Sequence, residues 1–206
     1  MTTPLDIVQE LNYDHHRRMT ELHKQRVEFG QIEAINEIDD LSYRTLLVEV
    51  PRDRRCILEL GSASGAQWPL LLEWSDPHAP CEMHGIDLFA PLVMKAQAEG
   101  RFVQLGFVED MNMYLAESFD LVCSRHVMEH LGDVDRGIRE IIRVTAPGGY
   151  IAHVTPDFDN DNEPAHLNKW GLARWTAKWI EHGIRLLSAN KYPFHGGEVH
   201  IVGRKP

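Results

Sequence analysis

The hydrophobic positions of this chain follow one pattern before residue 55 and another after it. Within the first 54 residues, Phe29, Ile32 and Ile35 recur every three positions with polar residues such as Glu33 between them, a spacing that is typical of amphipathic helices. From residue 55 onward, short apolar runs alternate with segments of helical spacing. We therefore predict an N-terminal helical extension or lid over residues 1–54, followed by the main domain over residues 55–206.

The apolar runs after residue 55 predict strands. They cover residues 55–60, 81–88, 101–106, 118–124, 149–155, 183–189 and 198–205. Helical spacing follows the first run at 66–74, the second at 90–100, and the fourth after Asp133, which can cap a helix N-terminus. Alternating strands and helices predict a parallel sheet with right-handed crossovers. The short spacing between the last two runs favours an antiparallel pair.

Composition and charge narrow the classes of protein and partner. Hydrophobic residues make up 43% of the chain and charged residues 25%, the proportions of an ordinary soluble globular protein. The formal net charge of −10 repels phosphate backbones, so we expect no nucleic-acid partner. The three cysteines have neither disulfide nor zinc-site spacing, and the chain shows no signal-peptide pattern and no apolar run that could span a bilayer. We expect a cytoplasmic protein without membrane contact.

A loop with two glycines follows the first predicted strand in the stretch ILELGSASG, residues 57–65. Glycines at such a place let a ligand approach the backbone, and the following helix offers free N–H groups. A pyrophosphate-binding loop would have the spacing G-x-G-x-x-G, but Ala66 stands at the third glycine position. Asp87 ends the next predicted strand, where a carboxylate can accept hydrogen bonds from ribose hydroxyls or cap a helix. Both roles of Asp87 stay open at this point.

Four blocks between residues 55 and 156 stand in a characteristic order. They are ILELGSASG (57–65), GIDL (85–88), ESFDLVCSRHVMEHL (117–131) and REIIRVTAPGGYIAHVTP (139–156). Together they resemble the motifs of class I S-adenosylmethionine-dependent methyltransferases, especially the small ones that act on small molecules and sugars. The resemblance implies an α/β fold with a doubly wound, mostly parallel seven-stranded sheet, whose last strand is inserted antiparallel next to the fifth.

The same resemblance implies S-adenosylmethionine as the cofactor and assigns residues to its parts. Asp87 would hold the ribose hydroxyls, and Leu88 would pack on the adenine. Ser124, just past the fourth strand, would lie beneath the cofactor near the reacting methyl. The first-motif residues that would shape the pocket for the methionine part are Glu59, Gly61, Ala63 and Gly65, with Ala63 in place of the family's middle glycine.

The third motif of the family departs from the usual pattern in this chain. It usually places an acid after a glycine at the end of the third strand, where the acid accepts a hydrogen bond from the adenine amino group. In LGFVED (105–110), that position is Phe107. Glu109 or Asp110 is then the expected adenine-reading acid, and the N–H of Val108 is the expected donor to the ring edge.

Methyl transfer to a hydroxyl requires an aligned acceptor and a base that removes its proton. The segment TPDFDNDNEPAHLNKW (155–170) offers His166 as the first candidate base, with a surface or helix-capping histidine as the alternative. His126 is a second candidate because it could face the cofactor pocket. Acids alternate over 157–163, but this segment lacks the glycine and final glutamate of an EF-hand. We predict no metal ligands there; a divalent ion that holds acceptor hydroxyls and a solvated acidic loop are the two alternatives.

These features predict an enzyme that transfers a methyl group from S-adenosylmethionine to a hydroxyl of a small-molecule acceptor, such as a sugar or a secondary metabolite. The alternative is a methyltransferase-like module that binds the cofactor without catalysis or acts with a catalytic partner, which Ala63 and Phe107 favour. A nicotinamide-dependent reductase is disfavoured by the glycine spacing and by the later blocks. The sequence leaves a homodimer open.

Overall fold

The computed structural model describes residues 40–158 and 165–206 of the 206-residue chain. The helices predicted before residue 40 and most of the acidic segment at 157–163 lie outside the described residues. The described part of the predicted extension contains helix α3 (Asp40–Leu46) and the 3-10 turn η1 (Leu47–Glu49). Across the described residues, no helix has the length and apolar character needed to cross a membrane.

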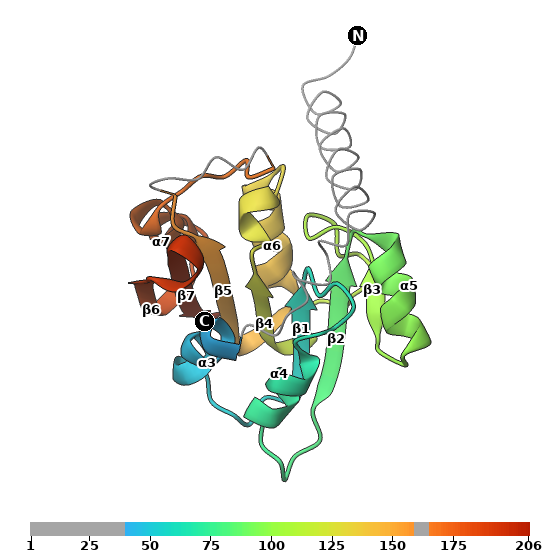
Figure 1. The fold of residues 1–206 in the computed structure, drawn as a ribbon. Coiled ribbons are helices and arrows are strands. Elements are labelled where there is room, and N and C mark those ends of the chain that lie inside the picture. The colour runs from blue at the N-terminus through green and yellow to red at the C-terminus, as the bar shows by residue number, and fades with distance from the viewer. Residues whose placement is uncertain (1–39, 159–164) are drawn as a thin grey trace.

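A seven-stranded sheet forms the centre of the described fold (Figure 1). Its strands are β1 (Cys56–Leu60), β2 (Glu82–Asp87), β3 (Val103–Leu105), β4 (Phe119–Arg125), β5 (Thr145–Pro156), β6 (Arg185–Tyr192) and β7 (Glu198–Arg204). Their order across the sheet is β3-β2-β1-β4-β5-β7-β6, and β7 runs antiparallel to both of its neighbours. The mostly parallel sheet with its last strand inserted next to the fifth, as predicted, is confirmed.

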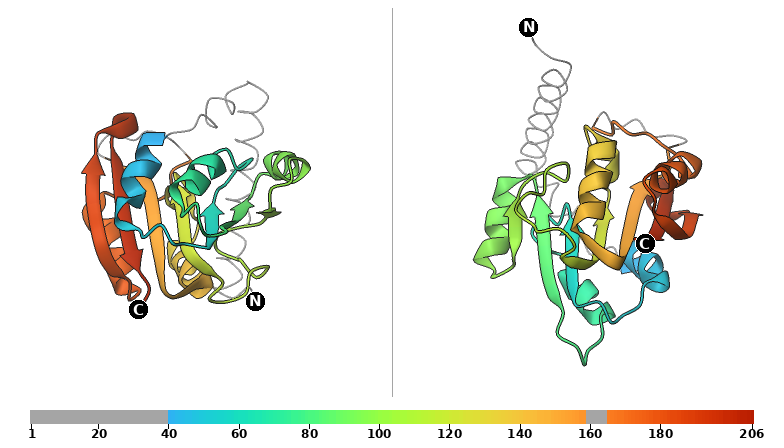
Figure 2. Two further views of the ribbon diagram at one scale, coloured as in Figure 1. Left: turned by 90° about the horizontal axis from the view of Figure 1, so that it is seen from below. Right: turned by 180° about the vertical axis from the view of Figure 1, so that it is seen from behind.

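Helices cover both faces of the sheet (Figures 1 and 2). Helices α3, α4 (Trp68–Trp74) and α5 (Ala90–Ala98) lie on one face, and α6 (Val134–Val144) and α7 (Leu172–Glu181) lie on the other. Each face has its own core, since Leu71 of α4 packs in a cluster with Ile57, whereas Trp179 of α7 packs in a cluster with Val122. The predicted doubly wound α/β architecture is therefore confirmed.

Local sequence signals explain where the helices begin and end. Pro69 lies in the first turn of α4, where a missing N–H leaves no hydrogen bond unmade. Asp133 caps α6 as predicted, because its side chain accepts a hydrogen bond of 2.9 Å from the N–H of Arg136. Gly100 follows α5 with a φ of 77°, a left-handed conformation that favours glycine and ends the helix.

Strand β5 begins earlier than the sequence predicts. The stretch APGG at 146–149 indicates a break between helix and strand, yet β5 starts at Thr145 and continues through this stretch. Thr145 pairs with Phe119 and Tyr150 pairs with Leu121, so the ladder has an irregularity at this point. Gly148 adopts a φ of 72° there. The proline and glycines therefore produce a bulge inside the strand instead of a loop before it.

The strand order changes direction at β1, which lies between β2 and β4. In open parallel sheets, ligands bind beyond the carboxyl ends of the strands at such a point. The carboxyl ends of β1 and β2 carry the glycine loop and Asp87. The fold thus brings the two sequence features that suggest a cofactor to the place where this architecture binds ligands.

Candidate functional site

The loop after β1 is wound so tightly that three of its residues have a positive φ. The φ angles of Gly61, Ala63 and Gly65 are 62°, 50° and 75°. The N–H groups of Gly61 and Ser62 both donate to the carbonyl oxygen of Ile86, at 2.8 and 3.2 Å. The loop therefore turns over the end of β2. Ala63 has the left-handed backbone conformation that glycine favours, although an alanine side chain disfavours it. The loop therefore keeps the backbone conformation expected for a glycine at this position.

The φ angles favour glycine at both positions of the loop, and close contacts with neighbouring side chains add to this, most strongly at Gly61. A Cβ atom on Gly61 would lie 2.3 Å from Cγ2 of Val127, and one on Gly65 would lie 2.7 Å from Cδ of Arg101. Gly61 thus allows the loop after β1 to pack directly against the segment after β4. Of the predicted first-motif residues, Gly61, Ala63 and Gly65 lie together in this one turn.

Asp87 ties the glycine loop to the start of α5. Its Oδ2 accepts a hydrogen bond of 2.8 Å from the N–H of Ala63, and its Oδ1 accepts one of 2.8 Å from the N–H of Phe89. The side chain is buried, and burial raises its pKa, although these backbone hydrogen bonds act in the opposite direction. Asp87 therefore forms a turn before α5 and does not cap the helix, whose N-cap residue is Phe89 with no side-chain cap hydrogen bond. Each carboxylate oxygen can accept a further hydrogen bond, so ribose binding is compatible with this turn.

Glu59 lies beneath the loop on the face of the sheet that α3 and α4 cover. Its residue is 2% exposed, and its carboxylate accepts hydrogen bonds from Tyr43 Oη at 2.7 Å and Trp68 Nε1 at 3.0 Å. The pKa of Glu59 is raised to about 7, because the effect of burial, with a smaller contribution from the nearby carboxylate of Asp87, outweighs the lowering by the two hydrogen bonds. A proton or a cation would therefore stabilise this acid.

The segment after β3 holds the residues predicted to read the adenine. The N–H of Asp110 donates to the carbonyl of Phe107 at 3.0 Å, which closes a turn. Leu88 follows the adjacent strand, β2, and is half-exposed. Val108 and Glu109 are buried, and Glu109 Oε1 accepts a hydrogen bond of 2.9 Å from the N–H of Gly132. Phe107 is 39% exposed. Glu109 is thus hydrogen-bonded to the segment just before α6. The carboxylate of Asp110 is partly exposed, and its Oδ2 lies 3.7 Å from Nη2 of Arg136.

Ser124 lies inside β4, which ends one residue later at Arg125, so the prediction that Ser124 follows the strand is wrong. Its Oγ is hydrogen-bonded to Nδ1 of His153 on the neighbouring strand at 2.6 Å, and the residue is fully buried. His153 stacks on Trp179 with ring centroids 5.0 Å apart. Burial lowers the pKa of His153 to about 3, so this imidazole is neutral. The pair is part of the sheet interior.

His126, directly after β4, meets a buried carboxylate that the sequence did not suggest. Its φ of 54° is left-handed, and its Nε2 lies 3.0 Å from Oε1 of Glu198 at the start of β7. Oε2 of Glu198 accepts hydrogen bonds from Ser42 Oγ at 2.6 Å and from His200 Nε2 at 2.9 Å. Burial alone would raise the pKa of Glu198, but the hydrogen bonds from His126, His200 and Ser42 outweigh it and hold that pKa below its ordinary range.

His166 lies beside a different histidine. Its ring is in edge contact with that of His130, with centroids 4.7 Å apart, and with Phe158 at 5.7 Å. His130 belongs to the 3-10 turn η2 (Met128–His130) that follows β4. Asn168 fastens the two segments together, since its Nδ2 donates to the carbonyl of Leu131 at 2.7 Å. The two predicted base candidates therefore have separate partners, Glu198 for His126 and η2 for His166.

Comparison with known proteins identifies the family. A family model described as a methyltransferase domain matches residues 30–190, which is more than half of the chain. The chain belongs to this methyltransferase-domain family. The uncharacterized methyltransferase YcgJ of Bacillus subtilis (strain 168) is 23% identical over 173 residues, which cover 76% of this chain and 67% of that protein.

Solved structures share the fold. One chain of the complex that contains the Trm112 methyltransferase activator of Haloferax volcanii matches 88% of this chain and 96% of its own length, with a TM-score of 0.74 and 15% identity. A SAM-dependent methyltransferase from Aquifex aeolicus matches 89% of this chain and 98% of its own length, with a TM-score of 0.68 and 12% identity. Family membership confirms the prediction of a methyltransferase enzyme.

Proposed function

We propose that this methyltransferase transfers a methyl group from S-adenosylmethionine to a hydroxyl of a small polar acceptor, such as a sugar or a secondary metabolite. The observation that carries the proposal is the pairing of His126 with the buried carboxylate of Glu198. The pair lies where β4 and β5 end, because Glu198 begins β7 and is paired with Pro156, the last residue of β5. A histidine held by a buried carboxylate is suited to removing a proton from a hydroxyl. An acceptor that is already a strong nucleophile would not require such a base.

The residues at the ends of β1 and β2 fit a cationic adenosyl cofactor. Glu59 and Asp87 are both buried acids with a raised pKa, and within residues 40–158 and 165–206 neither forms an ion pair with a basic side chain. S-adenosylmethionine carries a sulfonium and an ammonium group, so its positive charge would complement these acids. The loop also lacks the spacing of a phosphate cradle. The buried acids and the absence of a phosphate-cradle spacing therefore support a sulfonium cofactor.

Each part of the cofactor has a residue suited to hold it. Asp87 would accept hydrogen bonds from the ribose hydroxyls, and the half-exposed Leu88 would pack on the adenine. Gly61 and Gly65 would allow close approach of the methionine part. The N–H of Val108 would read the adenine edge, and Asp110 is the better placed acid for its amino group, because its side chain is partly exposed whereas Glu109 is buried. When bound, the cofactor supplies an electrophilic methyl group.

The base in this proposal is Nδ1 of His126. Because a carboxylate only accepts hydrogen bonds, the contact with Glu198 fixes the proton of the neutral ring on Nε2 and places the lone pair on Nδ1. Glu198 also stabilises the imidazolium that forms when Nδ1 takes the proton of an acceptor hydroxyl. The left-handed φ of His126 holds the ring at this position at a cost in backbone strain.

Two measurements test the proposal. Titration calorimetry with S-adenosylmethionine and S-adenosylhomocysteine should detect binding to the full chain, and Asp87→Ala should abolish it. With a panel of hydroxylated sugars and aromatic acceptors, formation of S-adenosylhomocysteine should be about 10²- to 10⁴-fold slower in His126→Ala, with unchanged cofactor affinity. The exposed histidine variant His78→Ala is the matched control and should behave as wild type. Equal turnover in His126→Ala and His78→Ala would refute the role of His126.

A cofactor-binding module without turnover is the second candidate function. The left-handed Ala63 in the glycine loop and the aromatic Phe107 at the usual position of an acid favour it. In that case, calorimetry would show cofactor binding that depends on Asp87, while no acceptor class would yield S-adenosylhomocysteine. The restoring variants Ala63→Gly and Phe107→Asp would then be the next proteins to assay.

A further inference from the structure

Two segments that follow neighbouring strands bring three metal-binding side chains together. Glu129 and His130 lie in η2 after β4, and His166 lies in the segment after β5. One ligand atom from each residue lies within 4.8 Å of the other two. Zinc bonds of about 2.1 Å place tetrahedral ligands about 3.4 Å apart, and Nε2 of His130 lies 3.8 Å from Oε1 of Glu129. A small closing movement would therefore allow all three atoms to bind one ion.

The hydrogen bond of His130 favours the tautomer that a metal ligand needs. Its Nδ1 lies 3.0 Å from the carbonyl oxygen of Ala165. Because a carbonyl only accepts hydrogen bonds, Nδ1 carries the proton, and the lone pair of the neutral ring is on Nε2, the atom that faces Glu129. Histidines that bind metals almost always donate their other ring N–H in this way, which fixes the ring and its tautomer.

Hydrogen bonds from the buried Asn168 connect the two segments that carry the cluster. Besides its bond to Leu131, the side-chain nitrogen of Asn168 lies 3.3 Å from the carbonyl oxygens of Met128 and Glu129, and the N–H of Asn168 donates to Glu129 at 3.0 Å. These bonds hold the segment that carries His166 against η2. Glu129 is fully buried, so a cation beside it would complement a charge that is removed from solvent.

We propose that Glu129, His130 and His166 form a binding site for a divalent transition-metal ion, such as zinc, on the acceptor side of the fold. Two imidazoles and one carboxylate are a ligand set that leaves coordination positions open for other oxygen ligands. Bound there, the ion would coordinate adjacent oxygen atoms of the acceptor and make its hydroxyl more acidic. The site stands independently of the proposed function, whereas this role in acceptor binding rests on it.

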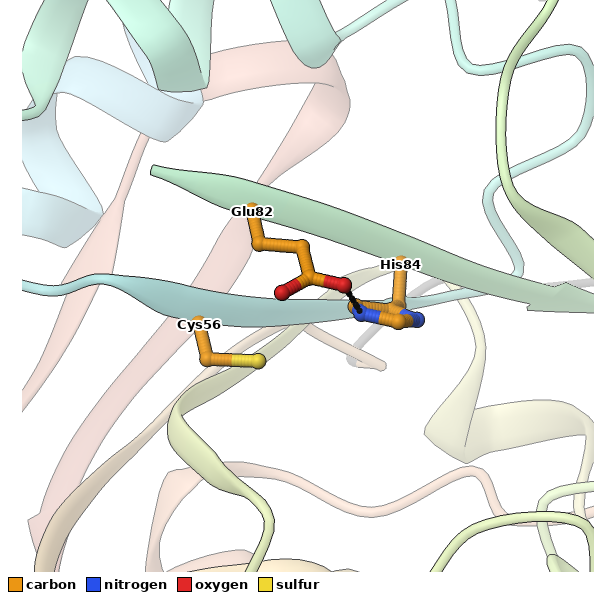
Figure 3. A group of neighbouring side chains, drawn as sticks. All are labelled: Cys56, Glu82 and His84. Atoms are coloured by element: carbon orange, nitrogen blue, oxygen red, sulfur yellow. Dashed lines mark hydrogen bonds and ion pairs between the residues drawn. The ribbon is translucent and has the colours of Figure 1, made fainter. Parts of the chain in front are cut away.

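A second cluster, Cys56, Glu82 and His84, provides an internal comparison (Figure 3). It lies at the amino ends of β1 and β2, whereas the glycine loop lies at the carboxyl end of β1. Figure 3 shows Glu82 already turned toward His84, with Oε1 2.8 Å from Nε2. Burial raises the pKa of the Cys56 thiol to about 11, which disfavours the thiolate that binds metals. This cluster is therefore the weaker of the two.

The experiment is titration of the untagged full chain, treated with a chelator, with zinc chloride in a calorimeter and with cobalt chloride in an absorption spectrometer. We expect one ion per chain, with cobalt absorption bands in the visible range. His166→Ala should weaken binding at least about tenfold, and His84→Ala should leave it unchanged. His166 is partly exposed, so the variant should fold, and its affinity for S-adenosylmethionine should equal that of the wild type.

Several results would overturn the metal site. They are no saturable binding by the wild type, equal binding by His166→Ala, and loss of binding in His84→Ala instead. Because cofactor affinity is measured on the same proteins, failure of the metal site is distinguished from failure of the proposed function. If the chain binds S-adenosylmethionine but no ion, the metal site is refuted alone. If it binds the ion but addition of zinc leaves the Michaelis constant for every acceptor unchanged, the acceptor-binding role is refuted.

Discussion

Replacement of the buried acid Glu59 by glutamine should change how the stability of the fold depends on pH. Glu59 is 2% exposed, and its folded-state pKa is raised to about 7 from an ordinary value of 4.5. A glutamine keeps the shape and removes the titration. Its oxygen can accept from Trp68 Nε1, and its nitrogen can donate to the hydroxyl of Tyr43, which is both donor and acceptor. The substitution therefore isolates the charge of Glu59.

The sign and size of the effect follow from the raised pKa. Below pH 4.5 the acid is protonated in both states and costs nothing, but as the pH rises the unfolded chain ionises first. The stability that protonated Glu59 contributes is lost as the pH rises through the folded-state pKa of about 7. A difference of 2.5 pKa units, from 4.5 to about 7, corresponds to about 3 kcal/mol in full. Between pH 5 and pH 8, about 2 to 3 kcal/mol of this should be seen.

The assay is urea unfolding of the wild type and Glu59→Gln at pH 5 and pH 8, without cofactor. The free energy of unfolding of the variant relative to the wild type should rise by about 2 to 3 kcal/mol from pH 5 to pH 8. Other titrating groups, such as Glu198, cancel in this comparison because both proteins contain them. The exposed variant Glu49→Gln is the control and should change by less than about 0.5 kcal/mol. Parallel pH dependences for Glu59→Gln and wild type would show that Glu59 is not held protonated by burial.

Two further predictions concern the backbone of the loop and the domain boundary. Ala63→Gly should raise the free energy of unfolding by up to about 1 kcal/mol in urea titrations, because glycine relieves the left-handed φ of 50°; a decrease would contradict this. Removal of residues 1–54 should unfold the domain, as measured by circular dichroism. Leu46, Leu47 and Val50 are buried in the core, and losing their burial costs about 5 to 9 kcal/mol, a large part of a domain's stability. A folded truncated protein would contradict the second prediction.

The fold could be predicted from the sequence because its signals are local. Apolar runs separated by helical spacing indicate the strands, and Asp133 and Gly100 mark helix ends through their own caps and φ angles. The exception is β5, where APGG indicates a break but forms a bulge inside the strand. Proline lacks the N–H that a ladder hydrogen bond needs, and glycine lacks a side chain that could pack. Whether a strand tolerates them depends on the neighbouring strand, which the local sequence does not show.

The candidate site could be predicted only where it follows directly from a strand end. The glycine loop and Asp87 are of this kind. Glu198 and His200 were missed because they come from β7 and are adjacent to His126 only through the antiparallel insertion of that strand; His126 and Glu198 are 72 residues apart in the chain. The alternation in EVH puts both side chains on one face of a strand, but the sheet register decides which face meets His126.

Helix α3 links the two acids that define the site. Ser42 and Tyr43 are adjacent in the chain, yet Ser42 Oγ donates to Glu198, and Tyr43 Oη donates to Glu59. Glu59 lies under the glycine loop, where we propose that the cofactor binds, whereas Glu198 holds the proposed base, His126. Because both acids are buried, each depends on these hydrogen bonds for its orientation, and Glu198 also depends on them to remain charged. The position of one short helix therefore affects both the charge beneath the glycine loop and the orientation of the proposed base. Residues 40–50 pack into the core of the main domain, although the sequence pattern changes after them.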